Sequence, residues 1–224
     1  MESPSAKSSP FFNRMPPSAQ RHVFIRQSVL FKNRDAPVNP RKVEMVDPDT
    51  ITKEIKQLVL DMGADVAGIA EYLPELTFEG SENLRHKSIV VFGMKMKFDY
   101  MVDIGPKSQS EVHRVYYELD DIGVRLSHHI GAYGYEARTQ PNIGDLPLPA
   151  YGWLAGLGEL GKHGSLISPE LGSSFRLSAL STDMPLVVDG PKDHGIDDVC
   201  VNCQLCARFC PGDAIKHEKK EVAG

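Results

Sequence analysis

Apolar residues along positions 49–63 recur every three or four residues, which is the spacing of one buried face of a helix. Asp49 or Thr50 is placed to cap the start of this helix, and Gly63 is placed to end it. The apolar stripe consists of Ile51, Ile55, Leu58, Val59 and Met62. The pattern therefore predicts a helix over most of this stretch.

A second, longer helix is predicted over about residues 110–131, because apolar residues repeat at helical spacing from Val112 to Ile130. A loop is expected over residues 95–107. Strands are predicted in four short segments rich in apolar or β-branched residues, at 65–70, 88–94, 133–137 and 175–182. This order of helices and strands indicates an α/β (α+β) fold with a layered core.

The composition divides the chain into three parts. Residues 1–48 are interpreted as a flexible N-terminal arm, disordered over the Ser- and Pro-rich residues 1–13 and wrapping the domain after them. Residues 49–190 are predicted to form the main α/β domain. Residues 191–224 hold every cysteine and are predicted to form a small C-terminal segment.

The composition also excludes several classes of protein. A chain of 224 residues with 41% hydrophobic and 25% charged residues is typical of a globular protein with a sizeable core. The net charge of −5 disfavours sequence-independent nucleic-acid binding. The longest apolar runs, such as residues 88–94, are too short to span a bilayer. A disulfide scaffold is disfavoured because all four cysteines lie within eleven residues.

The four cysteines follow the spacing of a bacterial ferredoxin, Cys200-x2-Cys203-x2-Cys206-x3-Cys210-Pro211. Thiolates at this spacing are typical ligands of a [4Fe–4S] cluster, whereas zinc sites favour two separated cysteine pairs. Zinc and free thiols remain alternatives. In two-cluster ferredoxins the fourth cysteine of such a run binds the other cluster, which would leave the ligand set incomplete here.

Three explanations of the incomplete ligand set stay open at this point. The chain is a fragment of a longer protein, a second subunit completes the site, or one unusual cluster uses all four cysteines. The fragment is the favoured interpretation. One or two [4Fe–4S] clusters are therefore expected.

Residues 142–172 contain seven glycines, a density that favours tight turns or a close approach of backbone to another group. The stretch L-A-G-L-G-E-L-G-K-H-G at 154–164 is followed by S-T-D-M-P-L at 181–186 and by the cysteine run. In this order the three motifs resemble those of the corrinoid iron–sulfur reductases, the group that includes reductive dehalogenases and epoxyqueuosine reductase. The resemblance covers about residues 112–215 and is closer to the reductive dehalogenases, partly through Y-G-Y at 133–135 and Asn142.

The resemblance implies a nitroreductase-like layer that binds a corrinoid (cobalamin), followed by a partial ferredoxin-like segment. The residues expected to contact the corrinoid are Leu157, Gly158, Gly161, Lys162, His163 and Gly164. Lys162 and nearby amide groups are expected to hold the phosphate of the corrinoid tail. The alternative interpretation of this segment is a tight turn from a strand to a helix with a solvated lysine.

The resemblance also implies a tyrosine that donates a proton, with a basic residue close to it. Tyr116 is the first candidate and Tyr117 the second, with Arg176 as the cation that stabilises a phenolate and Asn142 as a contact of substrate or halide. Tyr116 lies on the apolar stripe of its helix, so a purely structural role in the core is the alternative. An ordinary salt bridge is the alternative for Arg176.

The predicted function is therefore a corrinoid- and iron–sulfur-dependent oxidoreductase that removes halide from a small organohalide. An epoxyqueuosine reductase acting on modified tRNA is an alternative, although the acidic net charge disfavours it, and an electron-transfer ferredoxin-like module is another. The implied partners are an external electron donor such as ferredoxin or flavodoxin, with no nucleic acid and no transmembrane segment. The expected location is the cytoplasm, because reduced cobalt and iron–sulfur chemistry favour reducing surroundings.

Overall fold

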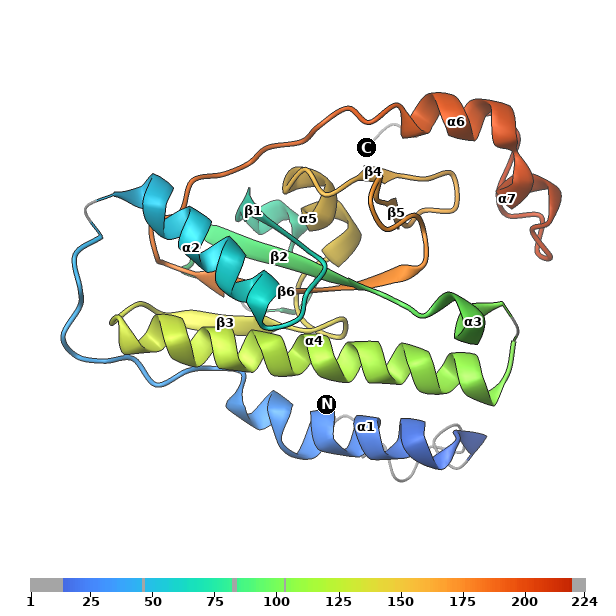
Figure 1. Ribbon diagram of the computed structural model, residues 1–224. Coiled ribbons are helices and arrows are strands. Elements are labelled where there is room, and N and C mark those ends of the chain that lie inside the picture. Colours follow the sequence, from blue (N-terminus) through green and yellow to red (C-terminus); the bar gives the residue numbers. More distant parts are fainter. Residues whose placement is uncertain (1–13, 46, 82–83, 103, 219–224) are drawn as a thin grey trace.

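A four-stranded antiparallel sheet forms the centre of the computed structural model, with helices on both of its faces (Figure 1). The structure describes residues 14–45, 47–81, 84–102 and 104–218, so the disorder predicted for residues 1–13 lies outside the described residues. The strands stand in the order β1 (Val66–Glu71), β2 (Ser88–Lys95), β6 (Phe175–Thr182) and β3 (Ala137–Gln140). The mixed fold expected from the sequence is confirmed.

The two faces of the sheet carry separate apolar cores because successive residues of a strand point to opposite sides. Val90 and Phe92 of β2 face helices α2 (Pro48–Asp61) and α4 (Pro106–Ala132). Ile89 and Val91 face α5 (Leu148–Leu154) and the hairpin made by β4 (Glu159–Leu160) and β5 (Leu166–Ile167). The glycine-rich segment therefore packs on the face of the sheet opposite to α4.

The strands predicted at 65–70, 88–94 and 175–182 correspond to β1, β2 and β6. The strand predicted at 133–137 is wrong by about four residues, because α4 continues to Ala132 and Tyr133 still closes its last turn. Residues 133–136 form the connection to β3. Their aromatic side chains suggested a strand, but Tyr135 is buried and its hydroxyl donates to the carbonyl of Val43 at 2.9 Å.

Two helix starts also differ from the prediction. The cap of α2 is Asp47, whose carboxylate accepts from the backbone N–H groups of Asp49 and Thr50, the two residues predicted for that role. Pro48 then occupies the first turn, where its missing N–H costs nothing. Helix α4 begins at Pro106 for the same reason, and a short helix, α3 (Phe98–Met101), lies within the predicted loop.

Over its described residues the N-terminal arm packs along the domain, as expected, and it begins with a helix that was not predicted from the sequence. Helix α1 (Pro17–Ser28) lies along α4 on the side away from the sheet, and a short turn, η3 (Leu30–Asn33), follows it (Figure 1). The chain then runs beside β3, where Ala36 donates to the carbonyl of Ala137 and Thr139 donates to the carbonyl of Arg34. The arm thus covers the edge of the sheet that β3 would otherwise expose.

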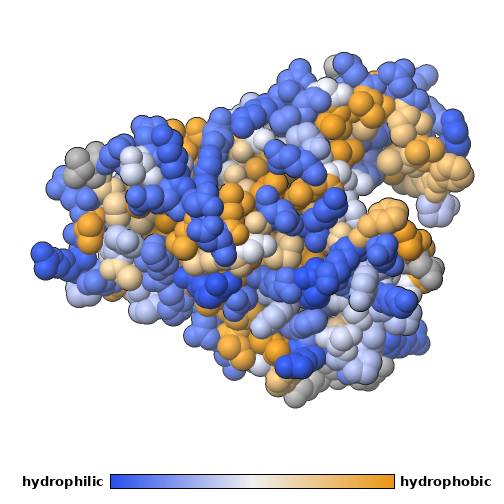
Figure 2. Space-filling model, viewed as in Figure 1, coloured by the Kyte–Doolittle hydropathy of each residue, from blue (hydrophilic) through white to orange (hydrophobic). Residues whose placement is uncertain are grey.

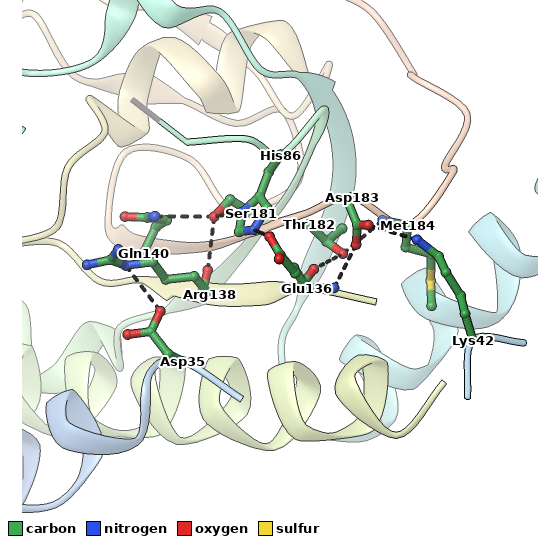
Figure 3. Close-up of polar contacts among 10 residues, drawn as sticks. All are labelled: Asp35, Lys42, His86, Glu136, Arg138, Gln140, Ser181, Thr182, Asp183 and Met184. Carbon is green, nitrogen blue, oxygen red and sulfur yellow. Dashed lines mark hydrogen bonds and ion pairs between the residues drawn. The ribbon is translucent and has the colours of Figure 1, made fainter. Parts of the chain in front are cut away.

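A polar seam of ten residues joins this covered edge to β6 (Figure 3). His86 Nδ1 lies 2.8 Å from the Ser181 hydroxyl, and Lys42 donates to Asp183 at 2.9 Å. The Thr182 hydroxyl donates to the carbonyl of Glu136 at 2.6 Å. Burial lowers the pKa of His86, so its ring is neutral at pH 7. Through Asp35 and Lys42, the seam ties the arm to the edge of the sheet.

The C-terminal segment is two short helices, α6 (Ile196–Cys203) and α7 (Leu205–Arg208), at the end of an extended connection (Figure 1). It presents apolar side chains to solvent, visible as orange surface at the upper right of Figure 2. Four of these side chains are more than half exposed: Val199, Val201, Leu205 and Phe209.

In the described part of the chain, no helix is both long enough and apolar enough to cross a lipid bilayer. The remaining short turn, η4 (Pro74–Leu76), follows β1.

Candidate functional site

A cavity of about 280 Å³ opens where the end of β3 meets the beginning of β6. It brings together Tyr116 from α4, Asn142 from the turn after β3, and Arg176 from the second position of β6. The rest of the lining is mostly apolar: Phe78, Leu146, Pro147, Leu148, Pro149, Ser165, Leu166, Phe175 and Leu177. The antiparallel pairing of β3 with β6 brings Asn142 and Arg176 to one end of the sheet, and α4, which packs against both strands, brings Tyr116 there.

Two guanidinium groups lie against the ring of Tyr116. The Cζ atom of Arg26 is 5.0 Å from the ring centroid, and that of Arg176 is 5.4 Å from it. Both distances are within the range of a cation–π contact. Arg176 was expected here, whereas Arg26 belongs to α1 and was missed. Its signal was the spacing of Ala19, Val23 and Arg26, which places the arginine on the buried face of a helix.

Arg26 also bonds two polar side chains next to Tyr116. Its Nε donates to Oδ2 of Asp120 at 2.6 Å, and its Nη2 donates to Oδ1 of Asn142. Asp120 stands one helical turn after Tyr116 and is 1% exposed. Burial raises the pKa of Asp120 to about 6, and the neighbouring Arg26 offsets only part of that effect.

His113 completes the group of polar residues around Tyr116. Its ring centroid lies 6.5 Å from that of Tyr116, edge to face. Burial, followed by the positive charge of Arg26, lowers the pKa of His113 to about 4. The imidazole is therefore neutral at pH 7 and adds no third positive charge beside Tyr116.

Asp120 and His113 are expected to give the stability of the protein two opposite pH dependences. The pKa of Asp120 is about 6 in the folded chain against an ordinary 3.8, so stability is lost as the pH rises through that interval. The pKa of His113 is about 4 against an ordinary 6.5, so stability is lost as the pH falls through that interval. Each contribution is on the order of 2–3 kcal/mol, and they cancel to a large extent.

Single substitutions should separate the two contributions. Relative to wild type, Asp120→Asn should gain roughly 2 kcal/mol in the free energy of unfolding between pH 4.5 and 7, and His113→Gln should lose about as much. Urea unfolding at four pH values measures both differences, in which the other titrating groups cancel. Parallel profiles for wild type and Asp120→Asn would contradict the assigned pKa of Asp120.

The glycine segment forms a tight turn through the β4–β5 hairpin. A Cβ atom at Gly158 would collide with the carbonyl oxygen of Ile167, and Gly164 has a left-handed backbone with φ of 78°. The predicted tight turn is therefore present, although it leads into a hairpin and not into a helix. The chain's own packing explains Gly158, and contact of this segment with a corrinoid stays a prediction.

The remaining residues predicted for this segment make contacts of their own. Leu157 is buried against the sheet, and His163 Nδ1 accepts from the backbone N–H of Ser165 at 3.2 Å. Lys162 does not have water as its only partner, because its Nζ donates to the carbonyls of Lys216 and His217 at 3.1 and 2.8 Å. Gly161 packs beside Ile167 and His163. Lys162 therefore joins the glycine segment to the C-terminal segment.

Replacing Gly158 with Ala should lower the free energy of unfolding by about 1–3 kcal/mol, because the backbone of Ile167 cannot yield as a side chain would. Gly105→Ala is the matched control, since Gly105 has an extended backbone and open space where a Cβ would lie. Urea unfolding of both variants makes the comparison. Equal stability of the two would show that the hairpin accommodates the added methyl group.

The cysteine run faces the glycine segment across a second cavity of about 420 Å³. Cys200 and Val201 line it on one side, and Leu160, Gly161 and Lys162 on the other. Glu159 strengthens the link, because its Oε2 accepts from the backbone N–H groups of His194 and Ile196 at 2.8 and 2.9 Å. The start of α6 is thus fixed to the glycine segment.

None of the four cysteines is in a disulfide. Backbone N–H groups of Ile215, Ala214 and Gly212 lower the pKa of the Cys210 thiol, which favours the thiolate that binds iron. Across the described residues, no three His, Cys, Asp or Glu side chains are already gathered as a metal site. In its chemistry the set of four thiols fits an iron–sulfur cluster, because soft sulfur donors are the usual ligands of iron in such clusters.

No family model matches the chain, but individual proteins do. It is 29% identical over 168 residues to a tetrachloroethene reductive dehalogenase of Dehalobacter restrictus, an alignment that covers 74% of this chain and 30% of that protein. An epoxyqueuosine reductase of Leadbetterella byssophila is 30% identical, over 73% of this chain and 64% of that protein. The chain is therefore similar in sequence to both reductive dehalogenases and epoxyqueuosine reductases.

Solved structures agree with this similarity. The catabolic reductive dehalogenase NpRdhA superimposes with a TM-score of 0.82 at 28% identity, over 94% of this chain and 32% of that one. Epoxyqueuosine reductase from Streptococcus thermophilus reaches a TM-score of 0.58 at 21% identity over 75% of this chain, which shows a shared fold. The homologues are oxidoreductases, and the chain spans about a third of the length of the dehalogenases that it matches.

Proposed function

We propose that this chain forms the substrate pocket and corrinoid-binding layer of a reductase that removes halide from an organohalide. The observation that carries the proposal is the cavity in which Tyr116, Asn142 and Arg176 meet within an apolar lining. An apolar halocarbon fits such a lining, and the three polar groups can serve the proton and the anion of the reaction. The resemblance to reductive dehalogenases over most of the chain supports the same activity.

The net reaction replaces a carbon–halogen bond by a carbon–hydrogen bond. Two electrons and one proton enter, and a halide ion leaves. A corrinoid held in this chain would supply the low-potential electrons for that reaction. The Tyr116 hydroxyl is the proton donor in our proposal, and the guanidinium groups of Arg176 and Arg26 stabilise the phenolate that remains. Asn142 contacts the departing halide.

The residues proposed to hold the corrinoid are those of the hairpin, Leu157, Gly158, Gly161, Lys162, His163 and Gly164. The fit rests on position, because Ser165 and Leu166 directly follow this segment and line the cavity. A group held by the hairpin would therefore border the proposed substrate. Arg176 Nε is buried and has no hydrogen-bond partner within the described chain, as expected of a donor that serves a bound molecule.

The cysteines Cys200, Cys203, Cys206 and Cys210 are proposed to bind iron in [4Fe–4S] form within a partial ferredoxin-like segment, residues 191–224. The contacts of Glu159 and Lys162 then hold the electron-delivering segment against the corrinoid-binding one. An external donor such as ferredoxin or flavodoxin would supply the electrons. Reduced cobalt and thiolate-bound iron favour a reducing compartment, so we propose the cytoplasm.

A second candidate is epoxyqueuosine reduction, which the alignment over 64% of the Leadbetterella enzyme favours. The two candidates differ in their substrate. The test is to purify the protein without oxygen, load it with cobalamin, iron and sulfide, and supply reduced methyl viologen as the electron donor. Release of halide from tetrachloroethene or 3-bromo-4-hydroxybenzoic acid would support dehalogenation. Conversion of an epoxyqueuosine-modified tRNA stem loop, with no halide released, would overturn it.

A further inference from the structure

We propose that Arg26 is a positioning residue that turns the amide of Asn142, so that its NH2 group faces the cavity. This proposal rests on the proposed dehalogenase function. It adds a residue from the N-terminal helix to a site whose other polar residues, Tyr116, Asn142 and Arg176, come from much later in the chain. The observation behind it is a single guanidinium that contacts Asp120, Asn142 and Tyr116 together.

The geometry of Arg26 is that of a buried fork. The residue is 5% exposed, and the two bonds leave from different nitrogens, Nε toward Asp120 and Nη2 toward Asn142. The planar guanidinium fixes the angle between these two donors, so Asp120 on α4 sets where the second donor points. Arg26 therefore holds Asn142, which lies in a turn, at a fixed position relative to α4.

The bond to Arg26 decides which end of the Asn142 amide is available. Its Oδ1 accepts from Arg26, so Nδ2, which carries two hydrogens, is the end left for other contacts. Asn142 lines the cavity together with Arg176. With the oxygen engaged, the side chains of Asn142, Arg176 and Tyr116 all present N–H or O–H donors. A cavity lined in this way favours an anion over a neutral acceptor-free molecule.

A purely structural pair would not need the bond to Asn142. Buried ion pairs are often replaced by uncharged residues of similar size without loss of stability, so stability alone is a weak reason for a buried Arg26–Asp120 pair. The bond to Asn142 and the contact with the Tyr116 ring are the features that a counter-ion role leaves unexplained. They indicate that the pair orients the site.

The experiment measures bromide binding to the purified protein by the line width of the bromide NMR signal. It needs neither corrinoid, nor cluster, nor turnover, so its outcome is separate from that of the dehalogenation assay. We expect wild type to bind bromide and Arg26→Gln to bind it about fivefold more weakly. Arg26→Gln combined with Asp120→Asn should stay equally weak, although it restores the local charge balance and leaves no unpaired buried charge.

A double-mutant cycle with Asn142→Ala identifies the route of the effect. If Arg26 acts through Asn142, the variant with both substitutions should bind bromide no more weakly than Asn142→Ala alone. Arg26→Lys should bind at an intermediate level, because one ammonium cannot hold both partners in the geometry of the fork. Arg125→Gln is the matched control, since Arg125 pairs with Asp121 on the exposed side of α4, the helix that carries Asp120.

Three outcomes would overturn the proposal. The first is absence of bromide binding to wild type. The second is recovery of wild-type binding in the variant that lacks both Arg26 and Asp120, which would make Arg26 a counter-ion only. The third is full additivity of Arg26→Gln and Asn142→Ala. If Arg26→Gln alone fails to fold, the charge-balanced double variant supplies the comparison.

Discussion

Turnover of an organohalide by the holoprotein should fall by a factor of about 10²–10⁴ when Tyr116 is replaced with Phe. The substitution removes only the hydroxyl that is proposed to donate the proton, and it keeps the ring that packs between Arg26 and Arg176. Cobalamin and iron contents should stay at wild-type levels. Halide release and product formation, measured together, check the result.

The neighbouring Tyr117 provides the control. Its ring stacks on His22 at 5.2 Å and lies outside the cavity that holds Tyr116. Tyr117→Phe should therefore keep wild-type turnover. The reverse pattern, with Tyr117→Phe inactive and Tyr116→Phe active, would move the proton donor to the second candidate and show Tyr116 to be a packing residue.

The second large effect is expected in the iron content. Cys203→Ser should abolish the cluster that Cys200, Cys203 and Cys206 are proposed to share, whereas Cys210→Ser should leave its iron and its EPR spectrum nearly unchanged. The structure supports treating Cys210 separately. Cys200 and Cys203 lie on α6, while Cys210 follows α7 and has its own set of backbone N–H donors.

Iron per chain and EPR after anaerobic reconstitution make the measurement. Under this arrangement the cluster of the first three cysteines has no fourth thiolate from the run, so it should be labile or convert to a three-iron form. A stable four-iron cluster that is lost equally in both variants would show that all four cysteines bind one cluster. Cys206→Ser, expected to behave as Cys203→Ser, is the matched comparison.

The sequence was most informative where burial alone decides which residue types a position accepts. The uninterrupted apolar run of β2 and the stripe of α4 predicted the central layer, because burial on both faces of a strand leaves little room for polar residues. The resemblance and the spacing of Tyr116, Asn142 and Arg176 suggested a shared site, and the structure brings these three residues to one cavity. Their chemical roles stay predictions.

The sequence was least informative where the partner of a residue lies far along the chain. Arg26 stands in a stretch whose prolines and charges suggest an irregular arm, and its partners Asp120 and Asn142 lie about a hundred residues further along the chain. The glycines show a second difficulty. A Cβ at Gly158 is excluded by the chain's own hairpin, and the same residue pattern would arise from contact with a flat cofactor. Composition alone cannot separate these causes.

The packing of the N-terminal helix on α4 has a consequence for the order of folding. The contacts of Arg26 with Asp120 and Asn142 each close a loop of roughly a hundred residues. The hydrogen bonds between residues 34–36 and β3 close loops of similar length. Such distant contacts form late, because the entropy of loop closure comes before any gain. During synthesis, α1 therefore leaves the ribosome before the residues that it packs against and docks only after they have folded. The pocket gains its final shape only in that step, when α1 brings Arg26 to Asp120 and Asn142.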